Sequence, residues 1–263
     1  MIGTAAAVLL GADYFILLIF RMSGLVFSSP IFGRVNVPVI AKIGLVLSLG
    51  YLMFLIFPQS VPIHYTTLIG YVLLCAGELL LGMALAYVVN VMFSLTAFTA
   101  GQLIDMQIGF GIVNVFDAQN NTQVPMMGNV LNIMFILLFF LVNGHTRLIE
   151  IIYLTIDRMP IGTLVFSPAI GWTALEIFMR AFIMGVMMAL PIIASGLTIE
   201  FAFGMLMRAV PQIHMFVIGI PMKMIIGIIL FIVTIPVFAT FSERIFNEMF
   251  IGIEKMFANF VSG

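Results

Sequence analysis

Charged residues are scarce in this chain of 263 residues: Asp, Glu, Lys and Arg make up 8%, whereas soluble domains carry about 25%. The ten basic and eleven acidic residues are scattered, so there is no basic patch that would suit nucleic acid. Nucleic acid is therefore excluded as a partner. So few charges cannot cover a globule of this size with polar surface, and much of the outside must face lipid or other apolar protein.

Cysteine and histidine are also rare. The single cysteine, Cys75, excludes an intramolecular disulfide. His64, His145 and His214 lie far apart without the spacing of metal ligands, and the chain lacks nucleophile-elbow, zinc-protease and phosphate-loop patterns. We therefore expect no enzyme activity, no catalytic residue, no metal site and no cofactor.

What the chain has in abundance is hydrophobic sequence, at 63% of residues, with a mean hydropathy of +1.26. About 20 apolar residues in a helix cross the ~30 Å hydrocarbon layer of a membrane. Six apolar runs reach or approach this length, over residues 13–27, 39–57, 68–100, 126–142, 171–206 and 224–241. The sequence predicts an integral membrane protein.

The runs over residues 68–100 and 171–206 are too long for one straight crossing. Each has to tilt, kink, protrude or fold back. Pro191 offers a break in the second run, whereas the first contains glycines and no proline. We expect an all-α integral membrane protein made of bent helices or tight helical hairpins, with residues 1–263 forming a single helical membrane domain.

A weak internal repeat relates these two runs. Gly82, Ala86, Phe98 and Gly101 recur 103 residues later in the same order. Gly82 with Ala86, and the later pair Gly185 with Ala189, would give small-xxx-small faces for close helix contact. With 23 glycines in the chain, chance explains the repeat equally well.

Charges inside apolar sequence are expensive in a membrane unless they are paired or reach water. Glu176 and Arg180 are spaced to pair along one helix. Glu78 has no basic residue near it in the sequence, so it needs a partner on another helix, on another chain, or water. A structural ion pair and a proton relay both remain open for Glu78. The complete set of candidates is Arg21, Lys42, Glu78, Glu176, Arg180 and Glu200.

Residues 101–125 combine glycine, asparagine and glutamine with large apolar side chains. Irregular backbone at membrane depth survives only inside protein or along an aqueous path. We interpret this stretch as a glycine-rich pore loop, although an ordinary connection outside the membrane stays open. Its apolar core, called the gate segment below, runs from residue 109 to 116 and includes Gly109, Phe110, Gly111, Ile112, Val113, Val115 and Phe116.

Residues 208–223 contain a second interruption. Pro211, Gly219 and Pro221 break apolar sequence, and Arg208 and Lys223 flank it. The pattern predicts a turn that reverses the chain between the last two helices.

Three sequence matches resemble the FliR family, the export-gate membrane proteins of bacterial flagella, whose relatives serve virulence type III secretion systems. The first is GQLIDMQIGF at residues 101–110, with Asp105 and Gln107, followed by Asp117. The second contains Gly144 and His145 and continues to residues 160–162. The third is RAVPQIHMFVIGIPMK at residues 208–223, which includes Gln212. The resemblance extends over nearly the whole chain.

The resemblance implies a subunit of a hetero-oligomeric export gate in the bacterial inner membrane, at the flagellar basal body. Partners would be FliP-like and FliQ-like chains, together with FlhB-like and FlhA-like membrane proteins, lipid, and unfolded flagellar proteins in transit. The gate segment would close the pore. Assembly would depend on Asp105, Gln107, Asp117, Glu78, Gly144, His145, Arg208, Pro211, Gln212, Gly219, Pro221 and Lys223. A different class of function, an ion-coupled secondary transporter using Glu78 or Glu200, is the alternative.

Overall fold

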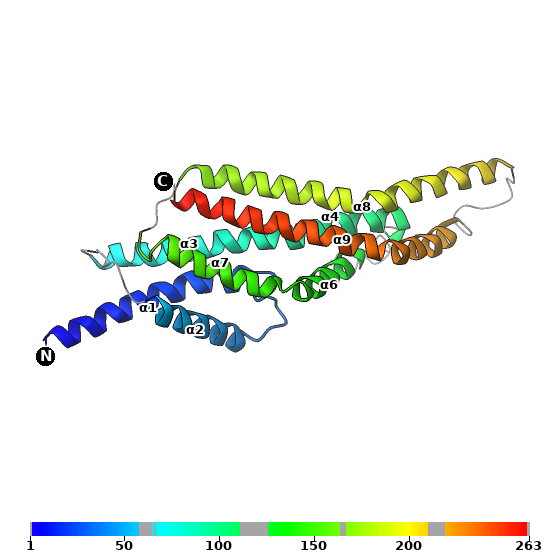
Figure 1. The fold of residues 1–263 in the computed structure, drawn as a ribbon. Coiled ribbons are helices and arrows are strands. Elements are labelled where there is room, and N and C mark those ends of the chain that lie inside the picture. The colour runs from blue at the N-terminus through cyan, green and yellow to red at the C-terminus, as the bar shows by residue number, and fades with distance from the viewer. Residues whose placement is uncertain are drawn as a thin grey trace. The chain divides into compact units, whose positions relative to one another are not determined.

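The structure is a computed structural model, and it describes residues 2–57, 65, 67–110, 126–163, 167–209 and 219–261. Within these ranges every regular element is helical, as the sequence predicts (Figure 1). In chain order the elements are α1 (Ile2–Ser28), α2 (Val39–Ile56), α3 (Leu68–Asn90), the π-helical turn η1 (Val91–Leu95), α4 (Thr96–Ile108), α6 (Met126–Leu141), α7 (Gly144–Arg158), α8 (Ala169–Ala209) and α9 (Ile220–Val261).

Five helical runs in the described residues are long and apolar enough to cross a membrane, and a sixth is added if α6 and α7 form one broken span. Leu68–Ile108 and Ala169–Ala209 are each 41 residues long, which corresponds to about 60 Å of helix. Both runs are continuous, so the hairpin alternative is wrong for them. The first absorbs a π-helical turn, and the second contains Pro191.

The chain divides into two compact units. The first consists of Met1–Val91, Val142–Ile177 and Glu248–Gly263, and the second of Met92–Leu141 and Phe178–Asn247. Helices α8 and α9 each contribute one end to the first unit and the rest to the second.

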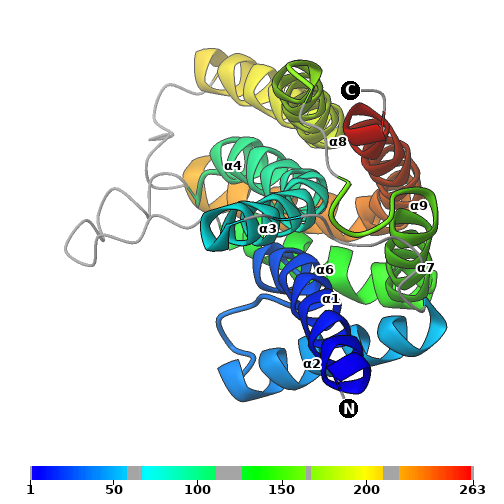
Figure 2. The same cartoon turned by 90° about the vertical axis from the view of Figure 1, so that its left-hand side faces the viewer.

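In the first unit, α1 lies between α2 and α3 (Figure 2). Glycines set how closely α1 and α3 approach. A Cβ atom on Gly24 would lie 2.3 Å from the carbonyl oxygen of Leu79, and one on Gly82 would lie 2.2 Å from that of Arg21. Ala86, one turn further along α3, is completely buried. The predicted small-residue face on α3 is confirmed at Gly82, because a Cβ atom there would clash with the backbone of α1.

Beside this contact lies the buried ion pair of the first unit. Arg21 Nε donates to Glu78 Oε2 at 2.6 Å, and the two side chains are 2% and 0% exposed. Arg21 Nη1 also donates to the carbonyl oxygens of Thr155 and Met159, at 3.2 and 3.3 Å. The backbone N–H of Gly162 donates to the other carboxylate oxygen of Glu78 at 2.8 Å. One charge pair therefore joins α1 and α3 to the end of α7.

The last part of α9 completes the first unit through an amphipathic stripe that includes the buried Phe250, Ile253 and Phe260. Lys255 donates to Glu176 of α8 at 2.5 Å. The guanidinium of Arg147 stands 4.2 Å from the centre of the Phe250 ring. Glu176 therefore has a partner on α9 that its local spacing with Arg180 did not predict.

The second unit has a core of phenylalanines from three parts of the chain. The Phe93 ring, from η1, is stacked on Phe246 of α9 with centroids 5.5 Å apart, and meets Phe139 of α6 edge to face at 5.3 Å. Phe135 completes the cluster, and all four side chains are at most 2% exposed. Such pairs add to the stabilisation from burial alone.

Replacing Glu78 with Gln should destabilise the protein by about 3 kcal/mol or more, because it leaves the buried Arg21 without a counter-charge. The expected observation is a lower melting temperature and lower complex yield in detergent. Glu176→Gln is the matched control, since its pair with Lys255 is 39–49% exposed and is expected to contribute about 0–1 kcal/mol. Equal stability of the two variants would contradict a structural role for the buried pair.

Candidate functional site

The gate segment starts where α4 ends. Helix α4 stops at Ile108, and Gly109 follows in the left-handed conformation with φ of 101° while its N–H donates to the carbonyl of Asp105 at 3.0 Å. A residue with a Cβ atom would be strained there, so the glycine is required by the turn. Phe110 is half-buried. The other predicted gate residues, Gly111, Ile112, Val113, Val115 and Phe116, and also Asp117, lie outside the described residues.

Asp105 holds both ends of the segment between α4 and α6. Its backbone carbonyl accepts from Gly109, where the chain leaves α4. Its carboxylate oxygens accept the N–H of Met127, in the first turn of α6, at 3.2 and 3.3 Å. The side chain is 2% exposed and caps an N–H that would otherwise have no partner within its own helix. One residue thus fixes the separation of the two ends.

The crossing of α4 and α6 lies one turn earlier, at Gly101. A Cβ atom on Gly101 would stand 2.1 Å from the Cα of Gly128. The expectation that the loop begins at residue 101 is therefore wrong, because Gly101 to Ile108 are helical and the irregular backbone starts later. Gly101 serves close packing, not bending.

Two further glycines receive side chains from the last turn of α4. The amide of Gln107 lies against Gly196 of α8, 2.3 Å from where a Cβ would be, and Ile108 lies against Gly227 of α9, at 2.9 Å from such an atom. A third contact sits further back, where Gly185 of α8 meets Thr99. The small-residue prediction for Gly185 is confirmed. Gly204, the residue that the repeat relates to Gly101, faces open space. Gly101 is tightly packed, so these two positions of the repeat do not share a structural role.

The interruption between α8 and α9 is flanked by a charge pair. Lys223 Nζ, in the first turn of α9, donates to Glu200 Oε1 of α8. A contact between these two helices is what a reversal of the chain between them would produce. Arg208 and Pro221 are exposed and Gly219 is buried. Pro211 and Gln212 lie outside the described residues, so the turn itself stays a prediction.

Gly144 and His145 belong to the first unit. Asn143 precedes them with φ of 55°, and its carbonyl accepts the N–H groups of Thr146 and Arg147 at the start of α7. Gly144 is buried and His145 is half-buried. These residues define the beginning of α7, whose far end supplies the carbonyls bound by Arg21.

Sequence reasoning identified Glu78 but missed the backbone groups that bind the Arg21–Glu78 pair, namely the carbonyls that accept from Arg21 and the N–H that donates to Glu78. Thr155 and Met159 act through carbonyl oxygens, and Gly162 through its N–H, so their side chains carry no signal of the role. The signals present in the sequence were Arg21, a basic residue among apolar ones, and the glycine at position 162, which the structure shows with φ of 85°.

The two carboxylates considered for ion coupling each have a basic partner in the same chain. In the part of the chain that the structure describes, no cluster of three or more His, Cys, Asp or Glu side chains is placed to hold a metal ion. Glu78 is bound by Arg21 and Glu200 by Lys223. Glu78 therefore stands as a structural ion pair.

Replacing Asp105 with Ala should free the first turn of α6. The loss of a buried, charge-assisted hydrogen bond is worth about 1.5–3 kcal/mol, so hydrogen exchange at the Met127 amide should accelerate by about 10- to 100-fold. Asp157→Ala, at an exposed position of α7, is the control and should leave that amide unchanged. Unchanged exchange in Asp105→Ala would show that the carboxylate does not hold this end.

Comparison with known proteins identifies the family. Residues 12–249 match the family described as bacterial export proteins, family 1. The chain is 30% identical to flagellar biosynthetic protein FliR of Escherichia coli K12, covering 88% of this chain and 87% of that protein. It is 30% identical to FliR of Bacillus subtilis, covering 89% and 90%, and 31% identical to FliR of Pectobacterium carotovorum, covering 88% and 87%. The resemblance to FliR is confirmed, and the chain belongs to the bacterial export proteins, family 1.

Proposed function

We propose that this protein is a structural and gating subunit of the flagellar type III export channel, through which unfolded flagellar proteins cross the inner membrane of a bacterium. The family match and the similarity to FliR over nearly nine-tenths of the chain support this function. The long apolar helices are suited to a multi-pass membrane subunit of the basal body.

The observation that carries the gating role is the rigid base of the gate segment. Asp105 holds the chain where it leaves α4 and where it enters α6, and glycine contacts lock α4 against its neighbours. A pore for unfolded chains has to exclude ions when empty, and a ring of apolar groups does this by expelling water. The apolar residues of the gate segment could supply such a ring, and the fixed base at Asp105 supports this role.

The proposed partners are FliP-like and FliQ-like chains, with FlhB-like and FlhA-like proteins beside them. Support comes from apolar surface that the chain leaves uncovered. Only 22% of Val39–Ile56 and 17% of an apolar 18-residue stretch within Pro221–Phe260 are buried within the chain. Helices from neighbouring subunits, as well as lipid, would cover these faces.

The transporter alternative gains no support. It assigned ion coupling to Glu78 or Glu200, and both carboxylates are engaged by basic residues of the same chain. An ion-coupling carboxylate has to exchange its ion with water during each cycle, which a fully buried and bonded Glu78 does not do in this conformation.

Deleting residues 109–116 should leave the complex assembled and make the membrane leak ions, since the base at Asp105 lies outside the deletion. Conductance of the purified complex in planar bilayers is the measurement. Phe110→Ala should leak less, because neighbouring apolar groups close over a small gap, and Phe98→Ala, on the exposed surface of α4, should not leak. Background conductance in an assembled deletion variant would assign the seal to another part of the gate.

Purification from a flagellated cell should recover this chain with other small membrane proteins, and the chain alone should transport nothing in liposomes. Mass spectrometry of the detergent complex and a flux assay on the isolated chain test these two outcomes. Solute transport by the isolated chain would end the export-gate proposal.

A further inference from the structure

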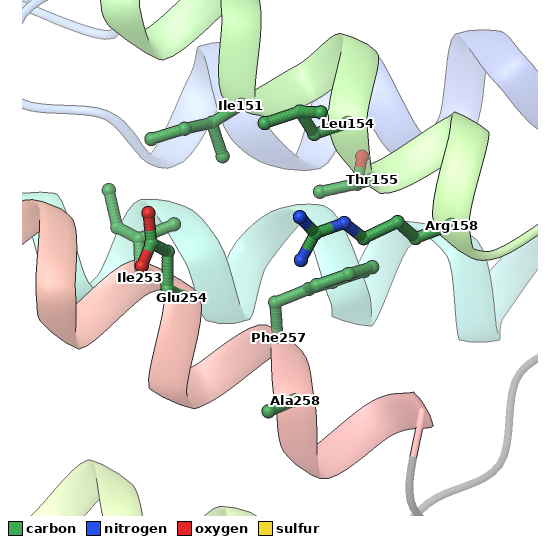
Figure 3. A pocket seen from close by; sticks show the side chains of 8 residues that line it. All are labelled: Ile151, Leu154, Thr155, Arg158, Ile253, Glu254, Phe257 and Ala258. Atoms are coloured by element: carbon green, nitrogen blue, oxygen red, sulfur yellow. The ribbon is translucent and has the colours of Figure 1, made fainter.

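In the first unit, a cavity of about 400 Å³ opens between the C-terminal parts of α7 and α9. Apolar side chains form most of its wall, among them Ile151 and Leu154 from α7 and Ile253 and Phe257 from α9 (Figure 3). This volume is in the range of small-molecule binding sites in proteins.

Two opposite charges face the cavity from its two sides. Arg158 comes from the last turn of α7 and Glu254 from α9, and both residues are exposed. In Figure 3 the guanidinium reaches into the cavity, toward the side where the carboxylate of Glu254 stands. Within the described ranges neither side chain makes a hydrogen bond or an ion pair, unlike Arg21, Glu176 and Glu200. Both remain available to a ligand.

We propose that this cavity binds a zwitterionic phospholipid with a primary ammonium headgroup, phosphatidylethanolamine. The phosphate pairs with Arg158, the ammonium donates hydrogen bonds to Glu254, and the first methylenes of the lipid chains contact Ile151, Leu154 and Phe257. A guanidinium is the side chain best suited to a phosphate. An anionic headgroup without an ammonium offers Glu254 no donor, and its negative charge repels the carboxylate. A choline headgroup has no N–H to donate to Glu254.

The place of the cavity along the helices fits a bilayer lipid. The apolar run of α9 ends at residue 241, and Glu254 stands beyond it, in the amphipathic second half of the helix. Arg158 is the last residue of α7. Charged residues at helix ends lie at the headgroup level of a membrane, with apolar residues one or two turns deeper. The lipid would continue from the cavity along the exposed apolar surface.

The test uses the full chain, purified with its associated subunits and delipidated in detergent. Phosphatidylethanolamine, phosphatidylglycerol and phosphatidylcholine of equal chain length are titrated, and bound lipid is counted by native mass spectrometry. Phosphatidylethanolamine should bind about tenfold tighter than the other two, the effect of one additional charged contact. Glu254→Gln should remove this preference, Arg158→Gln should weaken binding of all three lipids alike because each carries a phosphate, and Ala258→Trp should abolish binding by filling the cavity.

Arg244→Gln and Glu243→Gln, exposed positions of α9 outside the cavity, are matched controls that should keep the preference. Equal binding of all three lipids, an unchanged preference in the Glu254 variant, or unchanged lipid affinity in the Arg158 variant would overturn the proposal. So would a crosslink from residue 258 to a partner protein that excludes lipid. A direct ion pair between Arg158 and Glu254 would give a different result in lipid-free detergent. Each single variant would then have a lower melting temperature, and a double variant with the two charges exchanged would regain the original one.

Discussion

Close contact between helix backbones is the constraint on which the rest of this structure depends. Lipid is as apolar as a leucine side chain, so membrane helices gain little from hydrophobic burial and associate through tight packing and hydrogen bonds. Gly24 with Gly82 in one unit, and Gly101 with Gly128 in the other, bring the backbones together. Both contacts lie within about one turn of a buried carboxylate, that of Glu78 or Asp105. Tight packing and polar bonding therefore support each other, because glycine brings donors within reach and excludes the water that would compete.

The two carboxylates hold different kinds of partner. Glu78 is matched by a full charge on Arg21, whereas Asp105 accepts a backbone N–H at the start of α6. A buried ion pair adds little net stability relative to an apolar pair of the same shape, but removing one member is costly. Its value here is geometric, because Arg21 also binds two carbonyls at the end of α7 and so selects one arrangement of three helices.

The sequence predicted the helical class, most membrane runs, the need of Glu78 for a distant partner, and the small-residue faces on α3 and α8. It did not predict α7 or the second half of α9, because these are amphipathic and do not appear as apolar runs. The sequence also led us to place the start of the pore loop at Gly101. Glycine occurs both where a chain bends and where two helices pack closely, and the sequence alone does not distinguish the two. Backbone partners such as the N–H of Gly162 leave no trace in side-chain chemistry, so the Glu78 network was only half predictable.

A channel subunit of this kind has to combine a fixed frame with a part that moves. The charged groups belong to the frame: Glu78, Glu176 and Glu200 are each bound to a basic residue on a different helix. Moving Glu78 would separate buried charges in a medium of low dielectric constant, which is expensive, whereas the other two pairs are partly exposed and cost less to separate. Displacement of apolar groups past one another breaks no specific bond, and the positive φ of Gly109 lets the chain turn sharply as it leaves α4. The carboxylate of Asp105 and the turn at Gly109 belong to this frame, because they fix where the chain leaves α4 and where it enters α6.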